Sequence, residues 1–175
     1  YGRGDPSLSG LPLDLYAPVY GTPFPAYSSF NHVRQIVRDT GYYVQEHAKW
    51  GDFTLTLSGR SDTARTGDSW SGVFQGHTDD KFVPRVGLTY AVVPQAVLYA
   101  SYSESFLPQA GSTFGGVSLK PETGQQYEAG VKSNLWDGRV DVTASIYQLT
   151  RQNVATDDLG HPGYSVQTGE QRSKG

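Results

Sequence analysis

The histidine and acidic side chains of this sequence have the chemistry to bind a metal ion or to transfer protons. Its four histidines are His32, His47, His77 and His161. Their spacing does not set ligands together on one face of a helix or strand. His77 with Asp79 and Asp80 comes nearest to a divalent-ion site, but further ligands are missing, so a solvated acidic loop is the better interpretation. The pattern therefore predicts no metal site.

Motifs for nucleophilic catalysis and phosphate binding are not found either. Ser69 and Ser71 lie beside Gly72 but do not make a nucleophile elbow, and no glycine-rich phosphate loop precedes a helix. The sequence has no cysteine, which removes disulfides and thiolate ligands, and its net charge of -3 implies no polyanionic partner. We therefore expect a protein that is not an enzyme, holds no cofactor and binds no nucleic acid.

The composition favours strands and turns over helices. The 175 residues include 21 Gly and 12 Tyr, with few Leu-rich blocks. No apolar run approaches the roughly 18 to 20 residues that a membrane helix needs, whereas a barrel strand needs only about 9 to 11 residues with alternate apolar side chains. Because the sequence does not begin with Met, we interpret it as a piece of a longer protein.

Residues 1–34 are rich in proline and aromatic residues and predict a long loop with a packed aromatic face. Extended segments follow it. The predicted strands span about 35–49, 53–62, 81–91, 97–106, 122–135, 139–152 and 163 to the end. Pro84 lies inside the third of them and has no N–H for a ladder, so we expect a bulge or a frayed pair there.

Apolar and polar side chains alternate along these segments. Phe53, Leu55 and Leu57 fall on one face of the second segment, and Thr54 and Thr56 fall on the other. The later segments repeat this pattern. A strand of this kind fits either a half-buried position in a soluble protein or the wall of a membrane barrel.

The connections alternate in length. Tight turns at Gly51, Pro94 and Gly138 take turns with long polar stretches around Trp70, Gly115 and Gly160. Outer-membrane barrels sort short periplasmic turns and long external loops in this way, whereas a soluble sandwich has no reason to do so.

Aromatic and charged side chains agree with a barrel in a membrane. Trp50, Tyr90 and Trp136 flank the short turns, where they would form an interfacial girdle. The faces opposite the apolar ones carry charges that we expect to face the barrel lumen or a plug domain. These residues are Arg60, Arg85, Glu128 and Lys132.

Several motifs in family order resemble the TonB-dependent siderophore receptors. They are Tyr42–Gln45, Gly59–Arg60, Tyr99–Phe106, Lys120–Lys132, Tyr147–Asn153 and Ser165–Glu170. The segment from Leu13 to Tyr16 is also similar to a loop of the ferrichrome-type receptors. The resemblance covers nearly the whole chain.

The resemblance implies a bacterial outer-membrane protein that imports ferric siderophores with energy from TonB. Its fold would be all-β, with antiparallel up-and-down strands in a transmembrane barrel of about 22 strands around an N-terminal plug. Residues 1–34 would then be an extracellular loop, and residues 35–175 a partial barrel of about seven strands. We recognise neither plug nor TonB box in the sequence, so the contact with TonB would be made through a plug outside it.

A receptor for a ferric siderophore need not bind iron itself, because the chelate saturates the metal. Aromatic rings and polar side chains in the external loops would hold the chelate by stacking and hydrogen bonding. Our candidates are Tyr16, Tyr20, Phe24, Trp70, Phe74, Phe106 and Gln109. Each of these side chains could instead pack one loop against another.

The alternative from another functional class is a soluble β-sandwich module that binds carbohydrate through Trp70 and Phe74. Such a module would be monodisperse without detergent. An outer-membrane enzyme or an adhesin would require a catalytic constellation or surface repeats, and the sequence contains neither.

Overall fold

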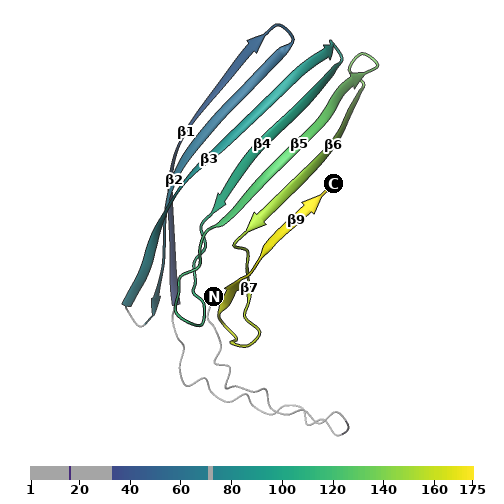
Figure 1. Ribbon diagram of the computed structural model, residues 1–175. Helices are drawn as coiled ribbons and strands as arrows, with labels where there is room; N and C mark the ends of the chain where they lie inside the picture. The colour runs from purple at the N-terminus through teal and green to yellow at the C-terminus, as the bar shows by residue number, and fades with distance from the viewer. Residues whose placement is uncertain (1–15, 17–32, 71–72) are drawn as a thin grey trace.

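The computed structural model describes Tyr16, residues 33–70 and residues 73–175 of the chain (Figure 1). It contains nine strands. Their bounds are β1 Val33–Trp50, β2 Phe53–Trp70, β3 Val73–Val93, β4 Ala96–Leu107, β5 Glu122–Leu135, β6 Val140–Gln152, β7 Ala155–Asp157, β8 Ser165–Gln167 and β9 Glu170–Lys174. In the described part of the chain, no helix is long and apolar enough to cross a bilayer. The expected all-β class is confirmed.

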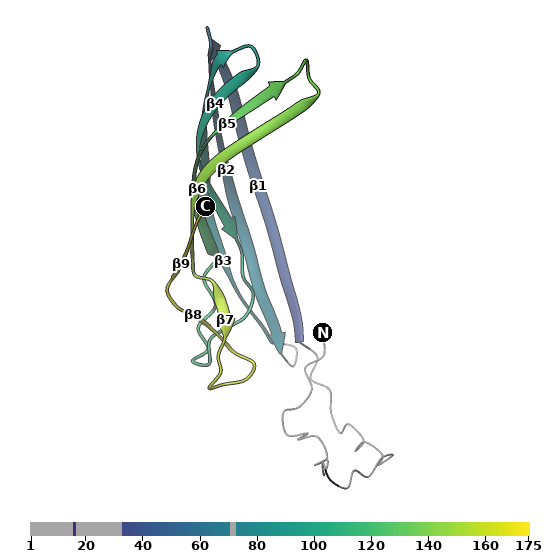
Figure 2. The same cartoon turned by 90° about the vertical axis from the view of Figure 1, so that its right-hand side faces the viewer.

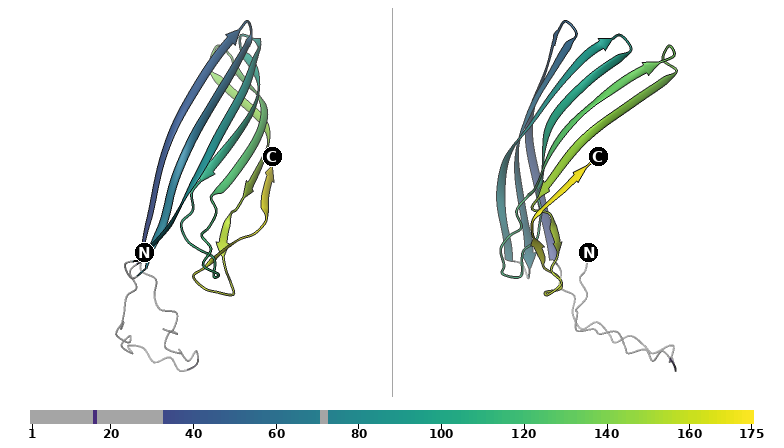
Figure 3. Two further views of the ribbon diagram at one scale, coloured as in Figure 1. Left: turned by 60° about the vertical axis from the view of Figure 1, so that its left-hand side comes forward. Right: turned by 45° about the vertical axis from the view of Figure 1, so that its right-hand side comes forward.

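Seven strands form a single antiparallel sheet in the order β1-β2-β3-β4-β5-β6-β9, and β7 pairs with β8 in a separate two-stranded sheet. Strands that are neighbours in the chain are therefore neighbours in the large sheet, as an up-and-down meander requires. The sheet is curved and its strands run obliquely (Figures 2 and 3). It forms one curved layer of the kind that builds a barrel wall.

Short turns gather at one end of the sheet (Figure 1). They follow β1, β3 and β5, and each contains the expected tight turn. The β5–β6 turn places Trp136 and Asp137 at φ values of 51° and 53°, and Gly138 at 86°. Positive φ at two successive turn residues matches the right-handed twist of the flanking strands. The longer connections 108–121 and 153–169 lie at the opposite end.

The expected polar loop around Trp70 is corrected by the structure. β2 continues to Trp70 and β3 starts at Val73, so only two residues separate these strands. Cross-strand bonds continue along this extension, with Thr63 Oγ1 donating to Asp80 Oδ1 at 2.6 Å. The backbone ladder needs no apolar face, and polar β-formers such as threonine extend it beyond the alternating part.

Two smaller expectations are also refined. The β3–β4 ladder ends at the pair Arg85 and Ser103, directly beside Pro84, so the expected frayed pair is confirmed. The register shift of this ladder lies elsewhere, between Ala91 and Val93. The last predicted strand is divided into β8 and β9. Gly169 lies between them with a φ of 74°.

The register confirms the two predicted faces. One row across the sheet pairs Leu55, Leu88, Ala100, Ala129 and Ile146 in sequence from β2 to β6. Directly paired residues share a face, so this row is apolar throughout. Ile146 is 72% exposed in this chain. A face of this kind requires an apolar neighbour outside the chain.

Glycine makes room for aromatic rings on this thin sheet. A Cβ at Gly130 would lie 2.5 Å from the carbonyl oxygen of Ala144 and 2.8 Å from Cε1 of Tyr99. The Tyr99 ring therefore covers its directly paired glycine. Gly87, on the same face, has only ordinary space around it, with Thr56 Cβ at 3.7 Å.

We predict that Gly130→Ala destabilises the full-length barrel by about 1 to 3 kcal/mol, because the added methyl group overpacks against backbone and ring. Gly87→Ala is the matched control and should change stability by less than about 0.5 kcal/mol. Urea unfolding in detergent micelles or vesicles measures both. Equal effects of the two substitutions would contradict this account of Gly130.

We also predict that Ile146→Arg impairs insertion of the full-length barrel into lipid. An arginine on a lipid face costs about 2 to 4 kcal/mol near the bilayer midplane. Ser101→Arg changes a residue on the opposite face and should be tolerated, since Ser101 pairs directly with Glu128 and with Gly87, which has ordinary space around it. The measurement is the folded fraction, from heat-modifiable gel mobility. Tolerance of Ile146→Arg together with failure of Ser101→Arg would reverse the assignment of the two faces.

Candidate functional site

The four charged residues expected in the lumen lie on one face of the sheet, opposite the apolar row. The register sets Arg85 beside Ser58 and Ser103, and Glu128 beside Ser101. Arg60 and Lys132 lie at alternate positions of β2 and β5 on that face. Their shared face is confirmed, and its contact with a lumen or plug stays a prediction.

Glu128 is the centre of a polar cluster on this face. The Tyr99 hydroxyl donates to its Oε1 at 2.5 Å, and Gln126 Nε2 donates to its Oε2 at 2.9 Å. Lys132 Nζ lies 5.1 Å from the centroid of the Tyr99 ring, within the range of a cation–π contact. The cluster holds its charges in fixed positions along the wall.

A second charged pair lies further along the same face, toward the long connections. Arg60 contacts the carboxylate of Asp62, with its terminal nitrogen 2.7 Å from Oδ2 and its Nε donating at 2.8 Å. Asp62 is only 1% exposed. A carboxylate with so little access to water requires a partner of this kind, so we assign Arg60 chiefly to neutralising Asp62.

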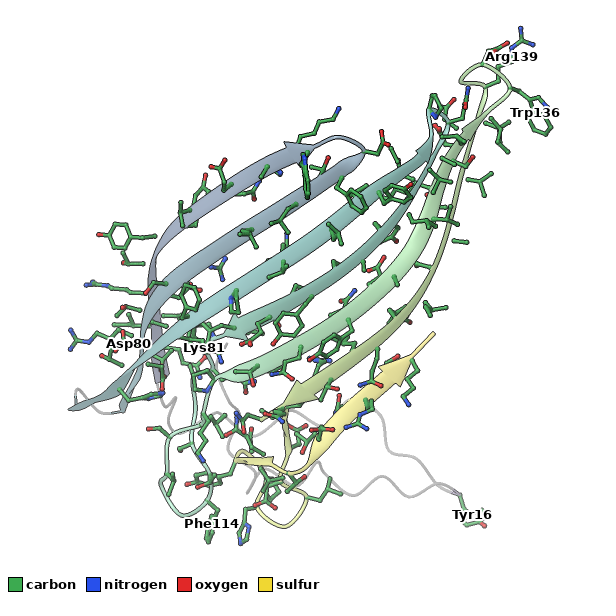
Figure 4. All side chains as sticks on the ribbon, turned by 45° about the horizontal axis from the view of Figure 1, so that its top comes forward. Tyr16, Asp80, Lys81, Phe114, Trp136 and Arg139 are labelled. Atoms are coloured by element: carbon green, nitrogen blue, oxygen red, sulfur yellow. The ribbon has the colours of Figure 1, made fainter. Side chains whose placement is uncertain are left out.

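The residues predicted to contact a ligand from the loops do not all lie in loops. Tyr20 and Phe24 lie outside the described residues. The Tyr16 side chain is fully exposed (Figure 4). Trp70 and Phe74 belong to β2 and β3, so their placement in a loop is corrected, although both lie at the end of the sheet where the long connections gather.

Of the two remaining candidates, Phe106 lies in a strand and Gln109 lies in a loop. Phe106 belongs to β4 and sits at an alternate position to Tyr102, on the apolar face. Phe106 therefore lies in the strand predicted for residues 97–106, and its place among the loop candidates is wrong. Gln109 does lie in the connection 108–121, where its amide donates weakly to Glu122 Oε2 at 3.5 Å and to the carbonyl of Asn153 at 3.4 Å. Gln109 thus contacts the first residue of β5 and the neighbouring connection.

The structure reveals a polar network that the sequence did not indicate. It joins loop 108–121 to loop 153–169 near their bases. Arg151 donates to Glu122 Oε1 at 2.7 Å, and Asn153 Nδ2 donates to the carbonyl of Pro121 at 3.0 Å. The side chain of Gln167 bonds to Lys120 and Asn153 at 2.7 to 2.8 Å. The two loops are therefore connected by side chains at the level where they leave the sheet.

An aromatic cluster joins the same loops at their outer end (Figure 4). The rings of Phe114 and His161 stack at a centroid distance of 3.6 Å, and Tyr164 meets Phe114 edge to face at 5.3 Å. His161 Nδ1 lies 3.0 Å from Asp158 Oδ2. This hydrogen bond is the main reason that the pKa of the Asp158 carboxyl is lowered from its usual value. The cluster thus combines an apolar contact with a charge-assisted one.

From the sequence, only the up-and-down order of the strands could have indicated that residues of these two loops contact each other. Loops at the same end of adjacent hairpins in a meander lie side by side, so an aromatic residue in one has a partner in the next. Sequence spacing does not show which side chains meet. Phe114 and His161 are far apart in the chain, and no local period connects them.

The described residues contain no group of three or more His, Cys, Asp or Glu side chains that could hold a metal ion. His77 lies in β3 with its Nε2 2.9 Å from Asp79 Oδ2, in a strand rather than in the acidic loop that the sequence suggested. What the chain provides is a two-faced wall with fixed charges, topped by two loops that carry exposed aromatic rings. This arrangement suits the binding and passage of a ligand.

Comparison with known proteins agrees with this architecture. The family model described as "TonB dependent receptor-like, beta-barrel" matches residues 2–175. The metal-pseudopaline receptor of Pseudomonas aeruginosa is 32% identical, over 99% of this chain and 26% of the relative. The ferrichrome outer membrane transporter/phage receptor of Escherichia coli is 34% identical, over 93% of this chain and 23% of the relative. This chain thus spans about a quarter of the length of these relatives.

Solved structures show the same arrangement of strands. The alcaligin outer membrane receptor of Bordetella pertussis matches with a TM-score of 0.60 and 27% identity, over 83% of this chain and 26% of that structure. The pyoverdine receptor of Pseudomonas aeruginosa matches with a TM-score of 0.66 and 26% identity, over 90% of this chain and 23% of that structure. This chain belongs to the TonB-dependent receptor β-barrel family, whose members are outer-membrane proteins.

Proposed function

We propose that this chain forms part of the barrel wall and of the external vestibule in a receptor that imports ferric siderophores across the bacterial outer membrane. The observation that carries the proposal is the continuous register across β2 to β6, which puts an apolar row on one face and serine, threonine and charged side chains on the other. An apolar exterior around a polar interior is the arrangement of a transmembrane barrel.

The ligand class is supported by the names of the relatives. These proteins are receptors for ferrichrome, ferrioxamine B and ferric pyoverdine. A ferric siderophore brings its iron already coordinated, so the protein needs no resident cofactor and performs no covalent chemistry. The iron is cargo, and the receptor is not an enzyme.

The partners follow from the family. In the complete receptor we expect about 22 strands around a plug, with TonB acting on the plug from the periplasmic side. Lipid would cover the face of Leu55 and Ile146. Arg60, Arg85, Glu128 and Lys132 would face the plug or the water around it. With a net charge of -3, no nucleic-acid partner is proposed.

The residues proposed to contact the siderophore lie at the end of the sheet with the long connections, or in the segment before β1. They are Tyr16, Tyr20, Phe24, Trp70, Phe74 and Gln109. Phe106 is withdrawn from this set because it shares the face of Tyr102. Because β1 begins at Val33, the predicted loop is shortened by two residues, and residues 1–32 are proposed to form an extracellular loop.

The β-sandwich alternative is not supported. A sandwich buries the apolar faces of two sheets against each other, whereas the described strands β1 to β6 and β9 form one sheet whose apolar side chains are exposed. The apolar face therefore has no second sheet to cover it in the described part of the chain.

We predict that the full-length receptor restores growth of an iron-starved host that lacks its own siderophore receptors, with at least one ferric siderophore from a panel of hydroxamate, catecholate and mixed chelates. Growth should require TonB, because outer-membrane uptake has no other energy source. The measurement is growth and uptake of radioactive iron in otherwise identical strains with and without TonB. Uptake that is the same in both strains would contradict the proposal.

We further predict that Trp70→Ala weakens binding of that siderophore by about two- to tenfold, the range expected for losing one aromatic contact of 0.5 to 1.5 kcal/mol. Trp136→Ala is the control, because it removes the same ring from the turn at the opposite end of the sheet. Equilibrium binding to the purified receptor measures both. An equal loss of affinity in the two variants would remove Trp70 from the binding site.

A further inference from the structure

Loops 108–121 and 153–169 contact each other at two levels. At the base, the polar network joins Lys120 and Pro121 to Asn153 and Gln167. At the outer end, Phe114 packs on His161 and Tyr164. The backbone N–H of Ser165 also reaches the carbonyl of Ser112 at 3.4 Å. Neither loop belongs to the ladder of the large sheet, so these contacts decide how the loops lie relative to one another.

Gln167 makes the densest set of contacts at the base. Its Oε1 accepts from the backbone N–H of Lys120 at 2.8 Å, and its Nε2 donates to the carbonyl of Lys120 at 2.7 Å. The same Nε2 donates to the carbonyl of Asn153 at 2.7 Å. A single amide thereby satisfies both backbone groups of Lys120, as a paired strand would, and also holds the start of its own loop.

This role requires a glutamine. The side chain must donate and accept within one planar group, which a carboxylate at neutral pH cannot do. Glutamate at this position would keep the bond from the Lys120 N–H but would set a charged oxygen against two carbonyl oxygens. Asparagine would have the right groups on a chain that is one methylene shorter.

Asn153, at the start of loop 153–169, makes further hydrogen bonds between the two loops. Its φ of 57° turns the chain sharply where β6 ends at Gln152. In this conformation its Nδ2 donates to the carbonyl of Pro121, and its own carbonyl accepts from Gln167 and more weakly from Gln109. The bonds cross between the loops in both directions, so neither loop can shift alone without breaking several of them.

We propose that Gln167 is a positioning residue that fastens loop 153–169 to loop 108–121, so that the two external loops form one rigid wall of the vestibule and move as a single unit. Its consequence for siderophore binding rests on the proposed function. A wall held in its bound shape loses less conformational freedom when the ligand docks, which strengthens binding.

Spin labels test the coupling without any ligand. These 175 residues contain no cysteine, so in a full-length receptor whose other cysteines have been replaced by serine, Val117→Cys and Leu159→Cys introduce one label on each loop. Both positions are exposed, at 65% and 96%. With Gln167 present, we expect a narrow distribution of label distances, measured by electron–electron double resonance. Gln167→Ala and the isosteric Gln167→Glu should both broaden it.

Gln95→Ala is the matched control, since Gln95 lies in the short β3–β4 turn at the other end of the sheet. Gel mobility identifies folded protein in every sample. The distance distribution should stay narrow in the control. If it stays narrow in folded Gln167→Ala and Gln167→Glu as well, the proposal is overturned.

A second measurement uses the ferric siderophore found in the growth test. We expect Gln167→Ala to weaken its binding about fivefold or more, the effect of losing one or more neutral hydrogen bonds. The maximal TonB-dependent uptake rate at saturating ligand should be unchanged, because Gln167 is not proposed to contact the plug. Unaltered affinity in a variant with broadened label distances would overturn the preorganising role. If no ferric siderophore binds the unmodified receptor, the proposed function fails, while the label distances still decide whether the loops are coupled.

Discussion

The backbone ladder from β1 to β6 sets which side chains share a face, and the remaining features depend on that register. Because the described strands β1 to β6 and β9 form a single layer, each strand contributes to both surfaces of the wall. A slip of one residue in any pair would move an entire apolar set, such as Leu55 with Leu57, to the charged face. The tight turns after β1, β3 and β5 hold the register at one end of the sheet.

In a wall that is one sheet thick, side chains must pack closely on the strands and buried charges must be neutralised locally. Tyr99 can cover Gly130 and reach Glu128 only because glycine has no Cβ at the point where the ring crosses the strand. Asp62 is almost inaccessible to water, and Arg60 neutralises it. The two carboxylates Asp62 and Glu128 of the polar face are thus paired or hydrogen-bonded, which is how charges are retained where water is scarce.

The connections 108–121 and 153–169 are held in another way. They lie outside the ladder of the large sheet, although β7 and β8 pair within the second of them. They have no large apolar core, and Leu119 is the only residue of loop 108–121 among the buried hydrophobics of the described chain. Polar bonds at the base and stacked rings at the outer end take the place of a core. Loops connected in this way can present aromatic surface to a ligand without collapsing onto the sheet.

The sequence by itself determined the class of fold, the two faces and the positions of the tight turns. These depend on local rules: a period of two along a strand, and glycine, proline or aspartate where the backbone turns. The same rules placed Arg60, Arg85, Glu128 and Lys132 on one face. The length of β2 and β3 was underestimated because their polar ends pair through the backbone, which carries no hydrophobic signal. Only the tertiary structure decided that Gln167, Asn153 and Phe114 join two loops. Such contacts link residues far apart in the chain, and their partners are set by how adjacent hairpins lie in space.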